Sequence, residues 1–205
     1  AGTNGQPSQV HLQLRAGESV LLRAYQSRHV TGPAWTYRQP PCTPVVLTGT
    51  WQVDFVEGGP VLPAPAQLTQ LTSWTTLSDT NCQAFAGTAR YQLHFSTPDL
   101  AGQTVELSLG RVAQSARVRL NGKDYGTLLL PPYTVTVDNL KATENLLEVD
   151  VTSVSANRIR DLDQRGVKWK TFRDINIVDI NYKPFDASNW PLTDCGLLGP
   201  VTVAK

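Results

Sequence analysis

The residues best suited to chemistry lie in the segment from Ser155 to Cys195, which separates two predicted strands and is called the excursion below. Sugars present hydroxyl groups around flat C–H faces, so their sites combine planar aromatic rings with carboxylates, amides and guanidinium groups. A connection far longer than the median of ~4–6 residues is usually functional or packed against another surface. The predicted rings are Trp169, Tyr182 and Trp190, and the predicted polar neighbours are Arg173, Asp186 and Asn189.

Paired carboxylates would indicate glycoside hydrolysis, which needs two of them about 5–5.5 Å apart for retention or about 6.5–9.5 Å apart for inversion. Asp54 with Glu57, and Asp161 with Asp179, are nominal pairs. Their spacing does not show that either pair converges, and Asp54 lies on the polar side of a predicted strand. We therefore predict no catalytic residue in this chain, with a small glycosidase in its own right as the alternative.

The run Asp161-Leu162-Asp163 offers carboxylates of the kind that bind Ca²⁺. Arg158, Arg160 and Arg165 flank this run and supply the positive charge that an ion would otherwise provide. An ion-paired loop is therefore the favoured interpretation, and Ca²⁺ is the alternative. No other metal and no cofactor is predicted.

The three cysteines, Cys42, Cys82 and Cys195, are 40 and 113 residues apart. This spacing excludes the close pairs of a structural zinc site, and the odd number leaves at least one thiol free. Two interpretations stay open, namely three partly buried thiols or one disulfide with one thiol.

The charge balance limits the classes of partner. The chain has 18 basic and 17 acidic residues and a net charge of +1, so it has no field that would attract nucleic acid or an anionic membrane. No run approaches the ~18 apolar residues that a membrane-spanning helix needs. The chain contains no methionine, which suggests a processed or cloned fragment.

Strands must position these residues. Asn121-Gly122 is a strong hairpin signal, because both residues tolerate the positive φ of a type I′ turn. Apolar and polar residues alternate in the segments around it, and turn residues separate these segments, which predicts an antiparallel β-sandwich. The residues predicted to point inward are Trp51, Val53, Tyr91, Leu93, Leu107, Leu109, Val118, Leu120, Val135, Val149 and Val151.

We predict a single all-β domain over residues 1–205, with no helix of about 10 residues. Two short strands, Val10–Leu14 and Ser19–Tyr25, and a proline-rich linker are expected within residues 1–45. Residues 46–154 are expected to form the sandwich, 155–195 one long ordered loop, and 196–205 a closing strand.

An ordered set of motifs resembles the C-terminal region of glycoside hydrolase family 106, the α-L-rhamnosidase family. The resemblance spans roughly residues 8 to 203, and its specificity lies in the order of the set. The motifs are Ser73-Trp74-Thr75, Gly87-Thr88-Ala89-Arg90-Tyr91, Leu109-Gly110-Arg111-Val112-Ala113, the Asn121-Gly122 hairpin, Pro132-Tyr133, Glu144-Asn145-Leu146, Asn157-Arg158 and Gly196-Leu197-Leu198-Gly199-Pro200-Val201.

The resemblance implies a jelly-roll-like, galactose-binding-domain-like sandwich. Members of this kind are long enzymes whose catalytic carboxylates lie in an upstream barrel, which 205 residues of strands do not hold. It therefore implies a non-catalytic accessory domain that serves polysaccharide degradation in the periplasm or outside the cell. The excursion would then dock on the upstream catalytic domain. A free-standing module that binds an oligo- or polysaccharide, and an internal cap over the sandwich, are the alternatives.

Overall fold

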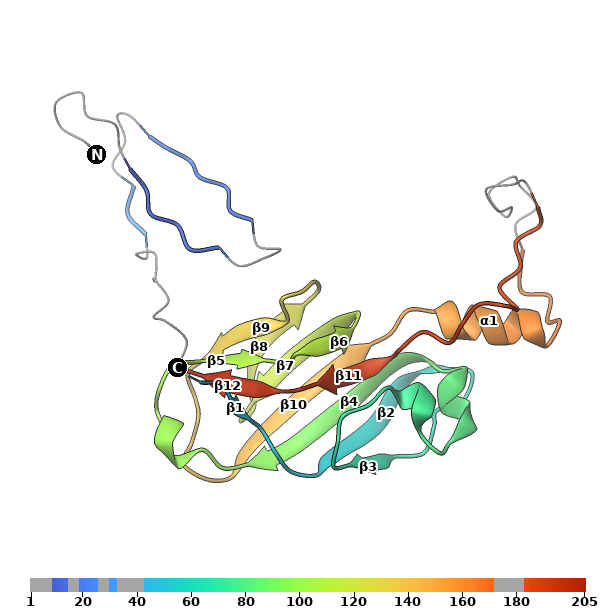
Figure 1. The fold of residues 1–205 in the computed structure, drawn as a ribbon, viewed down its shortest axis with the longest axis horizontal. Coiled ribbons are helices and arrows are strands. Elements are labelled where there is room, and N and C mark those ends of the chain that lie inside the picture. Colours follow the sequence, from blue (N-terminus) through green and yellow to red (C-terminus); the bar gives the residue numbers. More distant parts are fainter. Residues whose placement is uncertain (1–8, 15–18, 26–29, 33–42, 172–182) are drawn as a thin grey trace.

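The computed structural model describes residues 9–14, 19–25, 30–32, 43–171 and 183–205 of the chain. Its larger sheet has six antiparallel strands in the order β3-β2-β4-β10-β7-β8 (Figure 1). These strands are β2 (Trp51–Gly59), β3 (Ala66–Leu68), β4 (Ala86–Phe95), β7 (Ser115–Leu120), β8 (Lys123–Leu128) and β10 (Asn145–Thr152).

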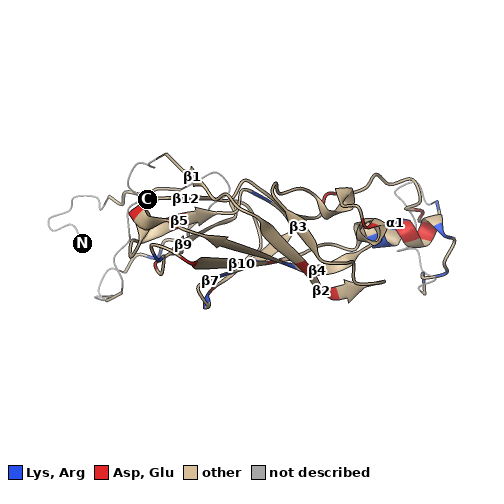
Figure 2. Cartoon of the chain, turned by 90° about the horizontal axis from the view of Figure 1, so that it is seen from below, with Lys and Arg blue, Asp and Glu red and all other residues tan. Residues whose placement is uncertain are grey.

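A second layer covers one face of this sheet, as the edge-on view of Figure 2 shows. Its four antiparallel strands have the order β1-β12-β5-β9, and a two-stranded ribbon of β11 and β6 continues it. Their bounds are β1 (Val45–Val46), β5 (Val105–Ser108), β6 (Arg111–Ala113), β9 (Thr134–Val137), β11 (Gly196–Gly199) and β12 (Thr202–Ala204). The predicted antiparallel β-sandwich is confirmed, and two strands replace the single closing strand expected after residue 196.

The core lies between the two layers and follows the predicted alternation. In β10, Leu147, Val149 and Val151 are fully buried, whereas Glu148 and Asp150 between them are half-buried on the outer face. The residues predicted to point inward are buried, apart from Val135 of β9, which is half-buried and packs against the core. Burial on one face therefore fixes the register of these strands.

The hairpin between β7 and β8 has the predicted two-residue turn. Asn121 and Gly122 both have positive φ angles, 51° and 80°, as a type I′ turn requires. The Asn121 side chain accepts a hydrogen bond from the Leu146 N–H (2.9 Å) and donates to the Asn139 carbonyl (2.8 Å). It also donates to Oδ1 of the fully buried Asn145 (2.9 Å), so this turn is tied to β10.

The expectation of no helix was wrong, because α1 (Ala156–Gln164) follows β10 inside the excursion. Three 3₁₀ turns, η1 (Trp74–Thr76), η2 (Thr80–Gln83) and η3 (Pro98–Leu100), also join strands. Helix α1 ends in a Schellman motif: Val167 donates to the Leu162 carbonyl (2.9 Å), Gly166 donates to the Asp163 carbonyl (3.1 Å), and Gly166 has a φ of 66°. The charged residues of this helix are Arg158 and Arg160 in its first half and Asp161 and Asp163 in its second half, so its pattern is one of charges rather than of apolar residues.

The strands expected at Val10–Leu14 and Ser19–Tyr25 are not formed. We call residues 9–32 the arm, of which 9–14, 19–25 and 30–32 are described, and these parts stand away from the sandwich in Figure 1. Leu21 is 95% exposed and Val10 is 64% exposed, so these two apolar side chains are largely uncovered. Two isolated strands are at best marginally stable without a packed face, which accounts for the difference.

Candidate functional site

The excursion begins where β10 ends, at one end of the sandwich (Figure 1). Asn157 of α1, which is 1% exposed, fastens the helix to the chain that leads into β11. Its amide donates to the Thr193 carbonyl (2.8 Å) and to Sγ of Cys195 (3.3 Å), and its Oδ1 accepts from the Thr193 N–H (2.8 Å). Helix α1 is therefore a rigid support for the rest of the excursion.

Asp163, near the end of α1, binds residues from two parts of the excursion, Trp169 and Lys170 on one side and Ala187 on the other. Its carboxylate accepts hydrogen bonds from Nε1 of Trp169 (2.7 Å) and from the Ala187 N–H (2.8 Å), and pairs with Nζ of Lys170 (3.1 Å). Desolvation disfavours the charged form, but the hydrogen bonds from Ala187, Trp169 and Lys170 outweigh it and lower the pKa of Asp163. The side chain is 6% exposed, and its hydrogen-bonding capacity is used inside the excursion.

Three aromatic rings pack edge to face beside Asp163. The Phe185 ring lies 6.0 Å from Trp169 and 5.5 Å from Trp190, with interplanar angles of 88° and 81°. Lys170 lies over the rings of Trp169 and Phe185 and donates to the Phe185 carbonyl (2.6 Å). Phe185 was not among the predicted site residues, although its place between two tryptophans in the excursion was a signal that it belonged there.

Trp190 is the most exposed ring of this cluster, with 40% of its surface exposed. Its backbone is fixed on both sides, because its carbonyl accepts from Nε of Arg160 (2.7 Å) and its N–H donates to the Ala187 carbonyl (3.0 Å). The ring is therefore both accessible and held in place. Such a ring suits either a sugar face or an apolar protein surface.

The predicted polar neighbours contribute less than expected. Asp186 accepts a hydrogen bond from the Ser188 N–H (2.8 Å), which is the main cause of its lowered pKa, and Asn189 is exposed. Trp169, Asp186, Asn189 and Trp190 thus gather around the end of α1, whereas Arg173 and Tyr182 lie outside the described residues. What these residues bind stays a prediction.

Large apolar side chains on the excursion are exposed as well. Val167 and Leu192 are 41% and 38% exposed, and Val154, directly before the excursion, is 42% exposed, all close to the value for Trp190. Exposed apolar residues are ordinary when scattered singly, but several on one short segment point to a contact with another surface.

The carboxylates considered for metal binding are paired with cations. Asp161 forms ion pairs with Arg158 (2.8 Å) and Arg165 (2.9 Å), which confirms the ion-paired interpretation, whereas Arg160 binds the Trp190 carbonyl instead. Within the described residues, no three His, Cys, Asp or Glu side chains gather in a way that could hold a metal ion. In the same part of the chain, no helix has the length and apolar character needed to cross a membrane.

Cys82 and Cys195 are buried free thiols, and Cys42 lies outside the described residues. Desolvation raises the pKa of each of the two buried thiols to about 11, so neither is a nucleophile at neutral pH. Of the nominal carboxylate pairs, Asp179 also lies outside the described residues.

The outer face of the six-stranded sheet is polar and paired within itself. Asp150 binds Arg90 (2.8 Å) and Arg119 (2.9 Å), and Glu148 accepts from Gln92 (3.1 Å). Charges that neutralise one another across neighbouring strands stabilise the sheet and leave little for a ligand.

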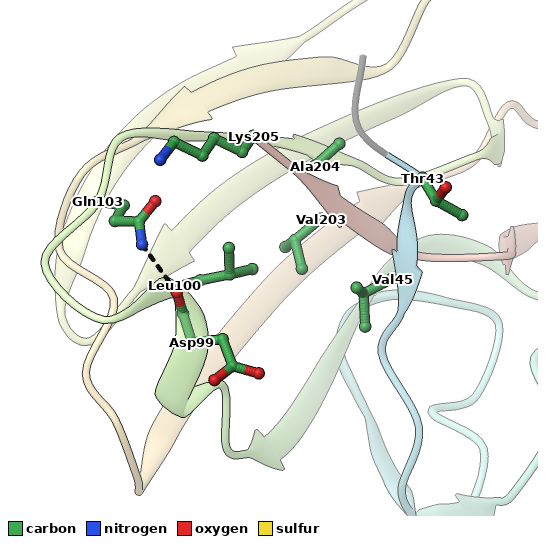
Figure 3. A pocket seen from close by; sticks show the side chains of 8 residues that line it. All are labelled: Thr43, Val45, Asp99, Leu100, Gln103, Val203, Ala204 and Lys205. Carbon is green, nitrogen blue, oxygen red and sulfur yellow. Dashed lines mark hydrogen bonds between the residues drawn. The ribbon is translucent and has the colours of Figure 1, made fainter.

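A pocket of about 280 Å³ lies at the opposite end of the sandwich, where the chain enters β1 (Figure 3). The residues that line it include the apolar Val45, Leu100 and Val203 and the polar Asp99 and Gln103. The Gln103 amide donates to the Asp99 carbonyl (2.7 Å). The predicted site residues that the structure describes are not among those lining this pocket.

No family model matches the sequence. The chain is 30% identical, over 96% of its length, to a curated protein of Formosa agariphila that is named as a β-glucuronidase, and it spans 19% of that protein. Among solved structures, it resembles a rhamnosidase from Novosphingobium sp. PP1Y with a TM-score of 0.65 and 29% identity. That similarity covers 83% of this chain and 16% of the rhamnosidase.

The chain thus spans less than a fifth of each of these two proteins. Sequence and fold agree on the class of relative, because both matched proteins are named as glycosidases. The chain is related to a β-sandwich domain of large glycosidases.

Proposed function

We propose that this chain is a non-catalytic accessory domain of an α-L-rhamnosidase-like enzyme of glycoside hydrolase family 106. In this proposal the excursion docks on the upstream catalytic domain, and the enzyme degrades polysaccharide in the periplasm or outside the cell. The similarity to about one sixth of a rhamnosidase supports an accessory role, since most of such an enzyme lies elsewhere. The family and the setting rest on the sequence motifs and on analogy.

One observation carries the docking role: the polar groups of Asp163, Trp169 and Lys170 within the aromatic cluster bind one another, while the Trp190 ring is exposed. Asp163 and the indole N–H of Trp169 bind each other, and Asp163 also binds Ala187 and Lys170. A sugar site needs such groups for the sugar hydroxyls. A protein interface instead needs a fixed, exposed aromatic anchor with apolar neighbours, as Trp190 is.

A free-standing carbohydrate-binding module is the second candidate. The 40% exposure of the Trp190 ring favours it, because one accessible indole face can stack on a sugar ring. In this case the isolated chain would bind a glycan, and its tryptophan fluorescence would change when the glycan is added. A docking domain would not respond to the glycan.

The test compares Trp190→Ala with the unchanged chain. Association with the catalytic part of the enzyme, supplied in trans, should weaken by about 10- to 30-fold, the loss of an interface anchor worth about 1.4–2 kcal/mol. Calorimetry with rhamnose-containing oligosaccharides should show no binding by either protein. The melting temperature should stay nearly constant, because the Trp190 ring lies at the edge of the cluster.

His94→Ala is the matched control. His94 is exposed on β4, near the end of that strand that lies away from α1, and its removal should leave the association unchanged. Glycan binding that Trp190→Ala abolishes would favour the module. A lower melting temperature without an effect on either interaction would show that the excursion is an internal cap, and would overturn the docking role.

A further inference from the structure

The arm has the sequence of a strand pair, but its described residues belong to none of the sheets. Residues 10–14 and 20–25 are rich in apolar residues, mainly leucine and valine, yet they form no strand. Seven large hydrophobic side chains of the arm are exposed by 37% to 95% of their surface: Val10, Leu14, Val20, Leu21, Leu22, Tyr25 and Val30. Such a surface on one short segment is not stable in water and indicates a contact.

The sandwich of this chain does not provide that contact. The six-stranded sheet faces the core on one side and carries the paired charges described above on the other. The strand nearest the arm in sequence, β1, is two residues long, and its Val45 and Val46 are themselves 53% and 51% exposed. An edge this short offers few backbone groups to two further strands.

The relatives indicate what the arm contacts. The sequence match to the Formosa agariphila protein covers 96% of 205 residues and leaves about 8 outside, fewer than the 24 residues of the arm. The match therefore includes at least two thirds of the arm, within a protein of which this chain spans 19%. Most of the arm thus aligns with a segment of a much larger glycosidase, in which other domains can contact that segment.

We propose that the arm is a β-strand pair that completes a sheet of a neighbouring domain of the same polypeptide. Its backbone would pair with an open strand edge of that domain, and its apolar side chains would enter that domain's core, as in β-strand addition. The unit that begins at β1 would then be the sandwich proper, which departs from the expectation of one domain over residues 1–205. This inference rests on the proposed function only in requiring a longer enzyme, and it concerns the end of the sandwich opposite to α1.

Hydrogen exchange read by mass spectrometry tests the inference on the isolated chain and on the full-length product of its gene. In the isolated chain, amides of residues 9–14 and 19–25 should exchange at the rate of an unstructured peptide. In the full-length product, they should exchange at least about 100-fold more slowly, as paired strands do. Leu21→Asp should restore fast exchange of the arm there, whereas Leu62→Asp, at a residue 49% exposed on the β2–β3 connection, should not.

Both substitutions should leave the melting temperature of the isolated chain unchanged, since both residues are exposed. Equally fast exchange of the arm in both proteins would overturn the inference. Protection of the arm in the isolated chain would overturn it as well. Protection that is independent of protein concentration would indicate that the arm folds onto its own sandwich, and protection that grows with concentration would indicate a dimer. A protected arm, together with an association with the catalytic part that Trp190→Ala does not weaken, would support this inference and overturn the proposed docking. An unprotected arm, together with an association that Trp190→Ala weakens, would overturn this inference and support the docking.

Discussion

Replacing Asn121 by aspartate separates the amide network of the β7–β8 hairpin from the turn itself. Aspartate tolerates positive φ as asparagine does, so the turn at 51° should persist. The substitution removes both side-chain donors, those to the Asn139 carbonyl (2.8 Å) and to Oδ1 of Asn145 (2.9 Å). It keeps the acceptor for the Leu146 N–H (2.9 Å).

The expected loss follows from these two bonds. Each is worth about 0.5–1.5 kcal/mol, and a buried acceptor left without a donor adds about 1–3 kcal/mol. Oδ1 of Asn145 keeps a donor in the Lys141 N–H (2.8 Å), so the penalty of an unpaired acceptor is counted once, for the Asn139 carbonyl. The free energy of unfolding should therefore fall by about 2–6 kcal/mol at pH 7.

The loss should depend on pH, because the new carboxylate faces two oxygen atoms. Its pKa in the folded state is raised above the value of about 3.9 in the unfolded chain. A raised pKa means that the unfolded state releases the proton first, so the deficit relative to the wild type is smallest below about pH 3.9. It then grows as the pH rises through the folded pKa.

Urea unfolding, followed by tryptophan fluorescence at pH 7 and at pH 4, measures this difference. Asn189→Asp, at an exposed position of the excursion, is the control and should change stability by no more than about 0.5 kcal/mol. A loss below about 1 kcal/mol at pH 7, or the same loss at both pH values, would refute the argument that the network, and not the turn alone, holds the hairpin.

Three further predictions concern the core, the chemistry and the thiols. Leu120→Ala, at a side chain 1% exposed, should lower the free energy of unfolding by about 2–5 kcal/mol in urea titrations. The purified chain should not hydrolyse aryl α-L-rhamnosides, and turnover that disappears in an Asp or Glu variant of this chain would overturn the accessory role. In Cys42→Ser, an aromatic disulfide reagent should label Cys82 and Cys195 at neutral pH only after unfolding, since burial raises the pKa of each to about 11. Labelling of the folded protein at pH 7 would contradict the burial of these thiols. Because the thiol pKa values are higher in the folded than in the unfolded state, the free energy of unfolding should fall as the pH rises from about 9 to about 11.

The strands could be predicted because local and global signals agree there. Leu147, Val149 and Val151 alternate with polar residues, and each meets the core because one face of the sheet is covered. The type of the Asn121-Gly122 turn is specified by two adjacent residues, both of which tolerate positive φ, so it could be predicted from the local sequence. The arm shows the limit of this reasoning, because alternation without a covering layer forms no strand.

Helix α1 could not be predicted from apolar periodicity, because its buried anchor is the polar Asn157. Its real signals are charges at helical spacing, as in Asp161 and Arg165, and the glycine that ends it, Gly166. In the same way, composition predicted that Trp169 and Trp190 belong to one site. It could not predict that Asp163 would use the Trp169 N–H, since that contact depends on how the helix ends.

The motifs that carry the family resemblance build the sandwich rather than a binding surface. Ser73 Oγ accepts from the Cys195 N–H (3.1 Å), and the Trp74 N–H donates to the Cys195 carbonyl (3.1 Å), which joins η1 to the start of β11. Gly196, with a φ of 98°, leaves no room for a side chain, because a Cβ there would lie 2.3 Å from the hydroxyl of Tyr91. Substitutions in the excursion can change which surface the domain binds without changing these contacts. The motifs therefore bear on fold and ancestry, whereas the partner must be tested at Trp190 and at the arm.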